Sequence, residues 1–423
     1  MAVNGIDSFE QNKEKYHLTA AVSDGINSFP LLFENILLFT YSNEMNRLYT
    51  EGYIEYEDKQ GTIDRIAERQ VAYCSITFEH DAQKADGDIA PKIIDQSIDL
   101  KFLINNIEIL GNVPGMVTYR IHLISENYLN LNRNVSFSNY NNSKTSVTEI
   151  IKDILENDAE IKTTNTFEIS KSNVNIDYIT QEDDNSFSAI KYLMNKMYFS
   201  PLIGNEESIK SLIYDENSNT ISLFDMKKGS PRMGMFPPVV VQVFKNDTNI
   251  GFDSPTNIGY TCRSGKIKGV LDTMTTNVYS YDIESNSISP QKFENKSIMN
   301  YYNGDNNGNP KMFYLLDGSK FKDQQMEWNN DTDIYGKMFD ALTKSNGLIV
   351  NQYGNIGTTP GYEVEVTIPN NFPVPSDTTR DNEFERMKYQ SYTGGWTVYK
   401  VDHYINPKKR MFRQKLVLMR NQA

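Results

Sequence analysis

The chain has 423 residues and a formal net charge of -13. This length exceeds that of most single compact domains and predicts two or three modules. A mean hydropathy of -0.54 is typical of a soluble protein. No apolar run approaches the roughly 18 residues that span a bilayer, which argues against stable membrane insertion. The acidic balance argues against sequence-specific nucleic-acid binding, because such proteins gather Lys and Arg on one face.

The N-terminus, MAVNGIDSFEQNKEKYHL, lacks a cationic leader followed by an apolar stretch. We therefore expect no signal peptide, and folding in a cytoplasm. The two cysteines, Cys74 and Cys262, are too few for a disulfide framework and form no CxxC motif. Cys74 shares one strand face with Ile76 and Phe78, which is the pattern of a small, buried, unreactive side chain.

Period-two patterns dominate the first third of the chain. In IDLKFLINNIEIL the apolar positions change parity at Asn105 and Asn106, which predicts a β-bulge of the kind that bends strands when sheets close into barrels. In VTYRIHLIS, His122 falls on the polar face, so we expect it to be exposed. Together with LTAAV, LLFENILLFTY and GYIEYED, these patterns predict an antiparallel, barrel-like domain over residues 1–137.

Helical spacing then appears, and predicts a mixed α/β module over 138–236. Ser146 and Glu149 form a capping-box pair before one apolar stripe, and a second stripe follows QEDDNS. The acids at that second start favour helix capping over acid-base catalysis; they are Glu182, Asp183 and Asp184. The stripes comprise Val147, Ile150, Ile151, Ile154 and Leu155, then Phe187, Ile190, Leu193, Met194 and Met197.

Strand patterns return in the last part of the chain, from VVVQVF and GYTCRSGKIKGVL onward. We expect a second barrel-like domain over 237–423, with an Asn/Gly-rich insertion at about 285–330 whose first part, 285–308, is an exposed loop. One helix is expected at about 332–345, ending at Asn346-Gly347. The predicted fold class is α+β, mainly β, with two barrel-like antiparallel domains flanking a mixed helical and strand middle module.

Motifs for catalysis, metals and cofactors are absent from the sequence. The four histidines, His17, His80, His122 and His403, have no metal-ligand spacing, and no nucleophile elbow, Walker loop or dinucleotide fingerprint occurs. His403 lies in GGWTVYKVDHYI, where simple alternation gives each face both apolar and polar groups, so we interpret it as structural or hydrogen-bonding. We predict no catalytic, metal or cofactor-binding residues, and therefore no enzyme.

The order of these segments resembles the central baseplate hub protein of contractile-tailed, T-even-type bacteriophages, and the hub part of type VI secretion spikes. The segments are SKTSVTEIIKDILEN, EDDNSFSAIKYLMNKMYFSPLI, GYEVEVTIPNN and GGWTVYKVDHYI, the last with a V-x-x-V-x-H pattern at Val398, Val401 and His403. The resemblance runs from about His17 to Arg420 and leaves 285–308 without a counterpart. EGYIEYED and PGYEVEVTIPN form a faint internal repeat.

The resemblance implies a structural virion protein of the tail baseplate, assembled in the host cytoplasm. Such hubs are homotrimers that join a six-fold tail tube, or its initiator, to a three-fold spike protein around a DNA channel, with baseplate wedge and tape-measure proteins as further partners. An acidic surface suits that channel. Two alternatives stay open, a tail-associated peptidoglycan-cleaving enzyme and a glycan-binding tail adhesin; the enzyme would need an acid in an apolar pocket, and the adhesin exposed aromatic patches.

Overall fold

A computed structural model describes residues 8–11, 14–69, 71–81, 96–140, 145–171, 178–180, 184–196, 210–216, 218–225, 239–242, 259–264, 275–282, 287–294, 311–317, 346–367 and 394–419. Strands predominate among them and pair almost throughout in antiparallel fashion, so the predicted mainly β, α+β class is confirmed. In this described part, no helix is both long enough and apolar enough to cross a membrane.

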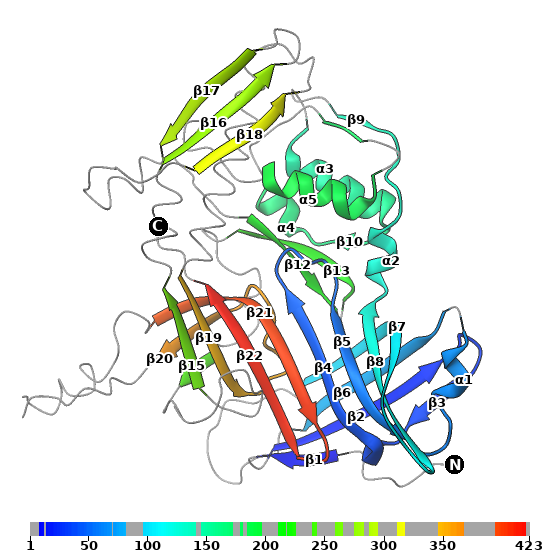
Figure 1. Cartoon of the computed structure of the whole chain (residues 1–423). Coiled ribbons are helices and arrows are strands. Elements are labelled where there is room, and N and C mark those ends of the chain that lie inside the picture. Colours follow the sequence, from blue (N-terminus) through cyan, green and yellow to red (C-terminus); the bar gives the residue numbers. More distant parts are fainter. Residues whose placement is uncertain are drawn as a thin grey trace, which may run out of the picture.

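The N-terminal strands form one antiparallel, strongly curved sheet in the order β1-β2-β6-β7-β8-β5-β4, with β3 paired to β2 (Figure 1). The predicted bulge is confirmed, because the β7–β8 register shifts between Ile104 and Asn106, and it shifts again between Ile109 and Gly111. The strands are β1 Ser8–Gln11, β2 Glu14–Ser23, β3 Ser28–Leu31, β4 Ile36–Glu44, β5 Glu51–Asp58, β6 Tyr73–Asp81, β7 Gln96–Val113 and β8 Met116–Ser125, with short helices η1 Phe33–Asn35 and α1 Asp64–Ala67.

The same sheet continues into the C-terminal part of the chain. Strand β4 pairs antiparallel with β21, and the order then runs β21-β22-β19-β15, while β20 joins β21 and β14 joins β20. Figure 1 shows the red C-terminal hairpin lying beside the blue N-terminal strands. These strands are β14 Val239–Gln242, β15 Gly259–Ser264, β19 Asn346–Tyr353, β20 Glu363–Thr367, β21 Gly394–Asn406 and β22 Met411–Met419.

Strand β21 corrects one sequence interpretation. The β21–β22 register shifts between Val398 and Lys400, which places a bulge at Tyr399. A bulge reverses the inward and outward alternation, so Val398 before it and Val401 and His403 after it are all buried. The mixture of polar and apolar groups on each face, expected from unbroken alternation, is therefore wrong.

Two apolar cores lie along this sheet. The first combines inward side chains of β2, β4, β5, β6, β7 and β8 with Ile356, Ile405 and Phe412 from the C-terminal part. Phe412 packs edge-on against Tyr16 at 5.4 Å and Phe78 at 5.0 Å between ring centroids. The second core contains Trp396 and apolar residues of β19, β20, β21 and β22. The C-terminal hairpin therefore contributes to both cores.

A helical module stands above the sheet and packs around its own core (Figure 1). The capping box is present, with the Glu149 amide donating to Ser146 Oγ at 3.3 Å and the Ser146 amide donating to Glu149 Oε2 at 2.8 Å. Its elements are α2 Asn127–Leu131, β9 Asn139–Tyr140, α3 Val147–Asp153, η2 Ile154–Asp158 (a π-helical turn), β10 Lys162–Thr163, α4 Thr166–Ile169, β11 Tyr178–Ile179, α5 Ser186–Lys196, β12 Lys210–Asp215 and β13 Thr220–Asp225.

Both predicted apolar stripes are found where the structure describes them. Ile150 and Ile154 in the first, and Ile190 and Leu193 in the second, are fully buried. The second helix is capped by Asn185, whose Oδ1 accepts from the Ser188 amide at 2.8 Å. Glu182, Asp183 and Met197 lie outside the described residues.

A separate three-stranded sheet contains β16 Thr275–Asp282, β17 Ser287–Glu294 and β18 Lys311–Asp317. The expected loop at 285–308 is corrected in part, because 287–294 pair with β16 and form strand β17. The helix expected at 332–345 lies outside the described residues. The three domain boundaries stay predictions, since the sheet crosses from the N-terminal to the C-terminal part.

Candidate interaction face of the shared sheet

The outward face of the sheet where the two parts of the chain meet is the candidate site. Tyr41, Ile54 and Ile121 point into the first core, so their strand neighbours point away from it. The pairing register then aligns Tyr404, Thr40, Tyr53 and His122 in one row across β21, β4, β5 and β8. A second row on the same face lies two residues along each strand and contains Asp402, Ser42, Glu51 and Ile124.

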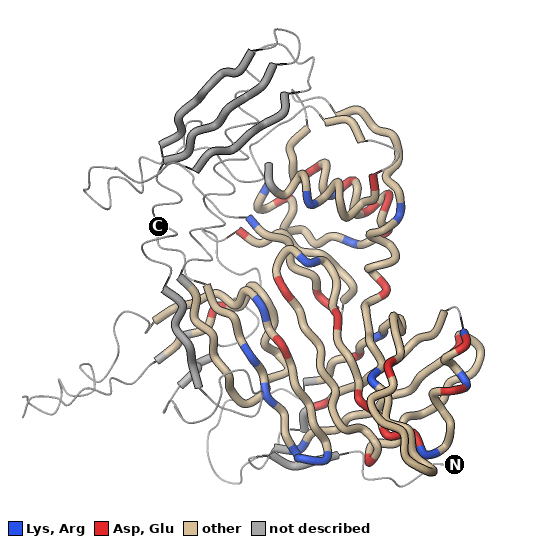
Figure 2. The backbone as a smooth tube through the Cα atoms, viewed as in Figure 1, with Lys and Arg blue, Asp and Glu red and all other residues tan. Residues whose placement is uncertain are grey.

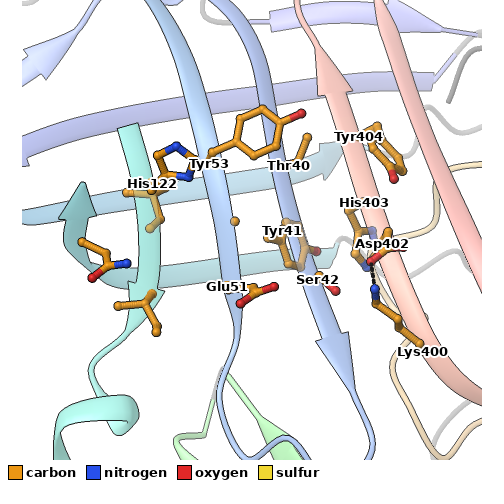
Figure 3. A pocket seen from close by; sticks show the side chains of 14 residues that line it. Thr40, Tyr41, Ser42, Glu51, Tyr53, His122, Lys400, Asp402, His403 and Tyr404 are labelled. Atoms are coloured by element: carbon orange, nitrogen blue, oxygen red, sulfur yellow. Dashed lines mark ion pairs between the residues drawn. The ribbon is translucent and has the colours of Figure 1, made fainter. Parts of the chain in front are cut away.

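These two rows surround a pocket with a volume of about 420 Å³. Figure 3 shows Tyr53 and Tyr404 on either side of Thr40, with Asp402 and Glu51 flanking Ser42 below them. Gly52 belongs to the lining, and a Cβ added there would lie 2.0 Å from the Thr40 carbonyl oxygen. Glycine at this position therefore lets β4 and β5 approach each other beneath the pocket.

The carboxylates of this face are held by cations. Lys400 Nζ lies 3.1 Å from Asp402 Oδ1, and Arg47 forms an ion pair with Glu51. Further along the face Arg120 contacts Glu55 at 2.7 Å and Glu108 at 3.4 Å, and His122 Nε2 lies 3.5 Å from Glu108. Figure 2 shows blue and red positions interspersed along these strands rather than segregated. The pocket is therefore polar without a large surplus of either charge.

Two of the three tyrosines that line the pocket, Tyr53 and Tyr404, are hydrogen-bond donors on its outward face at neutral pH. Burial and, secondarily, the nearby Asp402 raise the pKa of Tyr404 to about 12. Burial, with Glu55 adding to it, also raises the pKa of Tyr53. Both phenols are partly buried and keep their protons, so each offers an aromatic face together with a hydroxyl group.

His403 lies beneath this face, in the core, at 1% exposure. Its ring stacks on Tyr41 with 4.3 Å between centroids and an interplanar angle of 9°. Burial lowers the pKa of His403 to about 3, against the opposing effect of a hydrogen bond with the Thr358 backbone. His403 is therefore neutral, which agrees with the structural, hydrogen-bonding role predicted for it.

Three buried polar atoms near the pocket have no hydrogen-bond partner within the structure as described: His403 Nδ1, Tyr41 Oη and Ser42 Oγ. Orphaned buried polar groups are costly and uncommon. Two of them belong to side chains on the core side of the sheet, whereas Ser42 belongs to the outward row.

The remaining singled-out residues lie apart from one another. Cys74 is fully buried, and burial raises the pKa of its thiol to about 12, as expected for an inert side chain. His122 is partly exposed on the pocket rim, while His17 lies on β2 opposite Glu79. The side chains of His80 and Cys262 are outside the described set. Among described residues, no group of three or more His, Cys, Asp or Glu is arranged to hold a metal.

Sequence reasoning missed the pocket itself, because its residues come from five strands separated by up to about 360 positions. The sequence did contain one signal for the pocket. The polar face of two alternating strands carries a tyrosine, Tyr53 in GYIEYED and Tyr404 in KVDHYI. Only the pairing of β4 with β21 places these halves side by side.

No protein family model and no curated protein matches this sequence. Among solved structures, a tail protein from Neisseria meningitidis has a TM-score of 0.52 at 10% identity, covering 96% of this chain and 97% of that one. The 43 kDa tail protein of prophage MuSo2 from Shewanella oneidensis has a TM-score of 0.51 at 8% identity, covering 95% and 98%. The chain therefore shares its fold with these two tail proteins over nearly their whole lengths.

Proposed function

We propose that this chain is a structural protein of a contractile phage tail, the central hub of the baseplate. The observation that carries the proposal is the fold shared with two tail proteins over 95% or more of this chain. At such identities the likeness establishes the fold alone, so the role in the virion is our inference. The resemblance of the segment order in the sequence supports the same conclusion.

The hub acts as a homotrimer. Each chain contributes two halves of a continuous sheet, each half lying over one of the two apolar cores, so three chains supply six such units. A ring of this kind joins a six-fold tail tube to a three-fold spike protein and surrounds the channel for DNA. The net charge of -13 keeps DNA from adhering as it passes. Tube-initiator, wedge and tape-measure proteins are further partners in this proposal, and the virion tail is the location.

The proposed role needs no catalysis. A peptidoglycan-cleaving carboxylic acid requires a raised pKa. Backbone hydrogen bonds from Asn27 and Ile26 lower the pKa of Asp24. For Glu149, burial acts to raise the pKa, but Lys171 and Ser146 outweigh it and the net shift is downward. These two described carboxyl groups are therefore poorly suited to act as general acids.

The native mass of the purified chain at micromolar concentration tests the proposal against the 48.5 kDa protomer. Three chains per particle, and a stable complex with the cognate trimeric spike protein, are expected. A monomer that stays monomeric when the spike protein is added would contradict the hub. Lysis of purified cell walls by this chain alone, lost on substitution of one carboxylate, would favour the enzyme instead.

A further inference from the structure

The pocket on the outward face of β4, β5, β8 and β21 has walls suited to a neutral sugar ring. Tyr53 and Tyr404 lie in one cross-strand row on either side of Thr40 (Figure 3). A pyranose ring presents an apolar face of C–H groups, which packs on aromatic rings, and a rim of hydroxyls. Partly buried tyrosines match both features, because each combines an aromatic surface with a hydroxyl.

The floor of the pocket supplies the hydrogen bonds that a saccharide needs. Asp402 and Glu51 are planar acceptors held in place by ion pairs with Lys400 and Arg47. Fixed carboxylates of this kind lose little entropy when they accept bonds from neighbouring hydroxyls. Ser42 lies between them in the same cross-strand row, but its Oγ is buried beneath the pocket surface and does not face a ligand.

The electrostatics argue against a strongly charged ligand. Each pocket carboxylate already has a cationic partner within 4 Å, so neither a cation nor an anion gains an uncompensated counter-charge. The backbone argues against an extended peptide that adds a strand to the sheet. At this place β4 is paired with β5 and β21, and β5 with β4 and β8, so no free edge is available for such pairing.

We propose that this pocket is a binding subsite for one or two rings of a neutral saccharide. Its volume of about 420 Å³ falls within the range of small-molecule sites. The aromatic walls hold the ring face, and Asp402 and Glu51 bind the hydroxyl rim. The subsite goes beyond the hub proposal and does not depend on trimer formation.

Titration of the 423-residue chain with maltotriose and with chitotriose tests the subsite, using saturation-transfer NMR and calorimetry. At least one of these neutral trisaccharides binds at millimolar concentration or better. Tyr53→Ala and Tyr404→Ala each lower its affinity about tenfold or more, which corresponds to about 1.4 kcal/mol. Tyr128→Ala is the matched control, since Tyr128 is 37% exposed on α2, outside the pocket.

Milder variants guard against loss of folding. Tyr53→Phe and Tyr404→Phe keep the aromatic face and lose the hydroxyl, and Asp402→Asn keeps the shape and loses the charge. We expect the Phe variants to bind less tightly than the native chain and more tightly than the Ala variants. Affinities are compared only among variants whose thermal unfolding midpoint equals that of the native chain, because an unchanged midpoint shows that the sheet is folded.

Two results would overturn the subsite. Either neither trisaccharide binds the native chain, and a flexible Gly/Ser/Lys peptide that then binds in a Tyr53-dependent manner would indicate a peptide site. Or a trisaccharide binds equally to every pocket variant and to Tyr128→Ala. The native mass is measured on the same sample. A trimer that binds no sugar contradicts the subsite alone, and a monomer that binds sugar contradicts the hub alone.

Discussion

His403 shows how burial converts a titratable side chain into a packing group. Its ring lies between Tyr41 at 4.3 Å and Phe412 at 5.9 Å, where charging it would place an uncompensated cation in the first core. Isolated charges in such surroundings cost several kcal/mol, so the imidazole stays neutral. The V-x-x-V-x-H pattern is thereby explained by packing, because Val398, Val401 and His403 are all buried.

This neutrality predicts a specific loss of stability in acid. The pKa of His403 is about 3 in the folded chain and about 6.5 when unfolded. Between pH 6.5 and pH 3 the imidazole of His403 is therefore protonated in the unfolded state and neutral in the folded state. The free energy of unfolding falls by up to about 1.4 kcal/mol per pH unit from 6.5 towards 3, and the contribution of this group is constant above pH 6.5.

His403→Phe isolates this contribution, because a phenyl ring retains the stacking and does not titrate. Urea midpoints of the two proteins, measured at several values between pH 7 and pH 4, should converge or cross as the pH falls. The carboxylates are common to both proteins and cancel in the difference. Parallel pH curves for His403→Phe and the native chain would show that the imidazole does not remain neutral in the core.

Structural features whose signals come from adjacent residues were predicted correctly from the sequence. The capping box at Ser146 and Glu149 and the bulge beside Asn106 could be read from adjacent residues. The bulge at Tyr399 was missed, although the apolar positions change parity there as well, from Trp396 and Val398 to Val401 and Ile405. Its position is set by partners distant in sequence, since β21 must match both β4 and β22.

The capping box gives a prediction for α3. Ser146→Ala removes the acceptor of the Glu149 amide and frees the Glu149 carboxylate from Ser146 Oγ, which is 2.9 Å away. Such a change costs about 1 kcal/mol. Hydrogen exchange should show faster opening of the α3 amides, with little change in β5 and β8. Ser188→Ala on the exposed side of α5 is the control. If it lowers the stability of the chain as much as Ser146→Ala does, the capping box does not stabilise α3 specifically.

At the scale of the whole molecule, the pairing of β4 with β21 determines the architecture. Separate polar contacts bind the helical module to the same region: Asn43 Nδ2 and Thr50 Oγ1 both donate to Glu216 Oε1, at 2.6 and 2.9 Å. Patterns in the sequence indicated the strands, yet they could not indicate which strands pair. Strands β4 and β21 come from residues 36–44 and 394–406 and are joined by backbone hydrogen bonds. Such bonds do not depend on side chains, so neither segment shows in its own sequence which strand it pairs with.

The shared sheet makes the N-terminal core depend on the C-terminal hairpin, and Phe412 provides the test. Its ring is fully buried against Tyr16 and Phe78, so Phe412→Ala should cost about 3–5 kcal/mol. Hydrogen exchange should show the loss of protection in β2 and β6, which are remote in sequence. Leu418 is equally buried on the same strand but belongs to the second core, so Leu418→Ala should weaken β19 and β20 first. If Phe412→Ala leaves β2 and β6 as protected as Leu418→Ala does, the two cores are energetically separate, and the two sheet halves behave as independent domains despite their continuous hydrogen bonding.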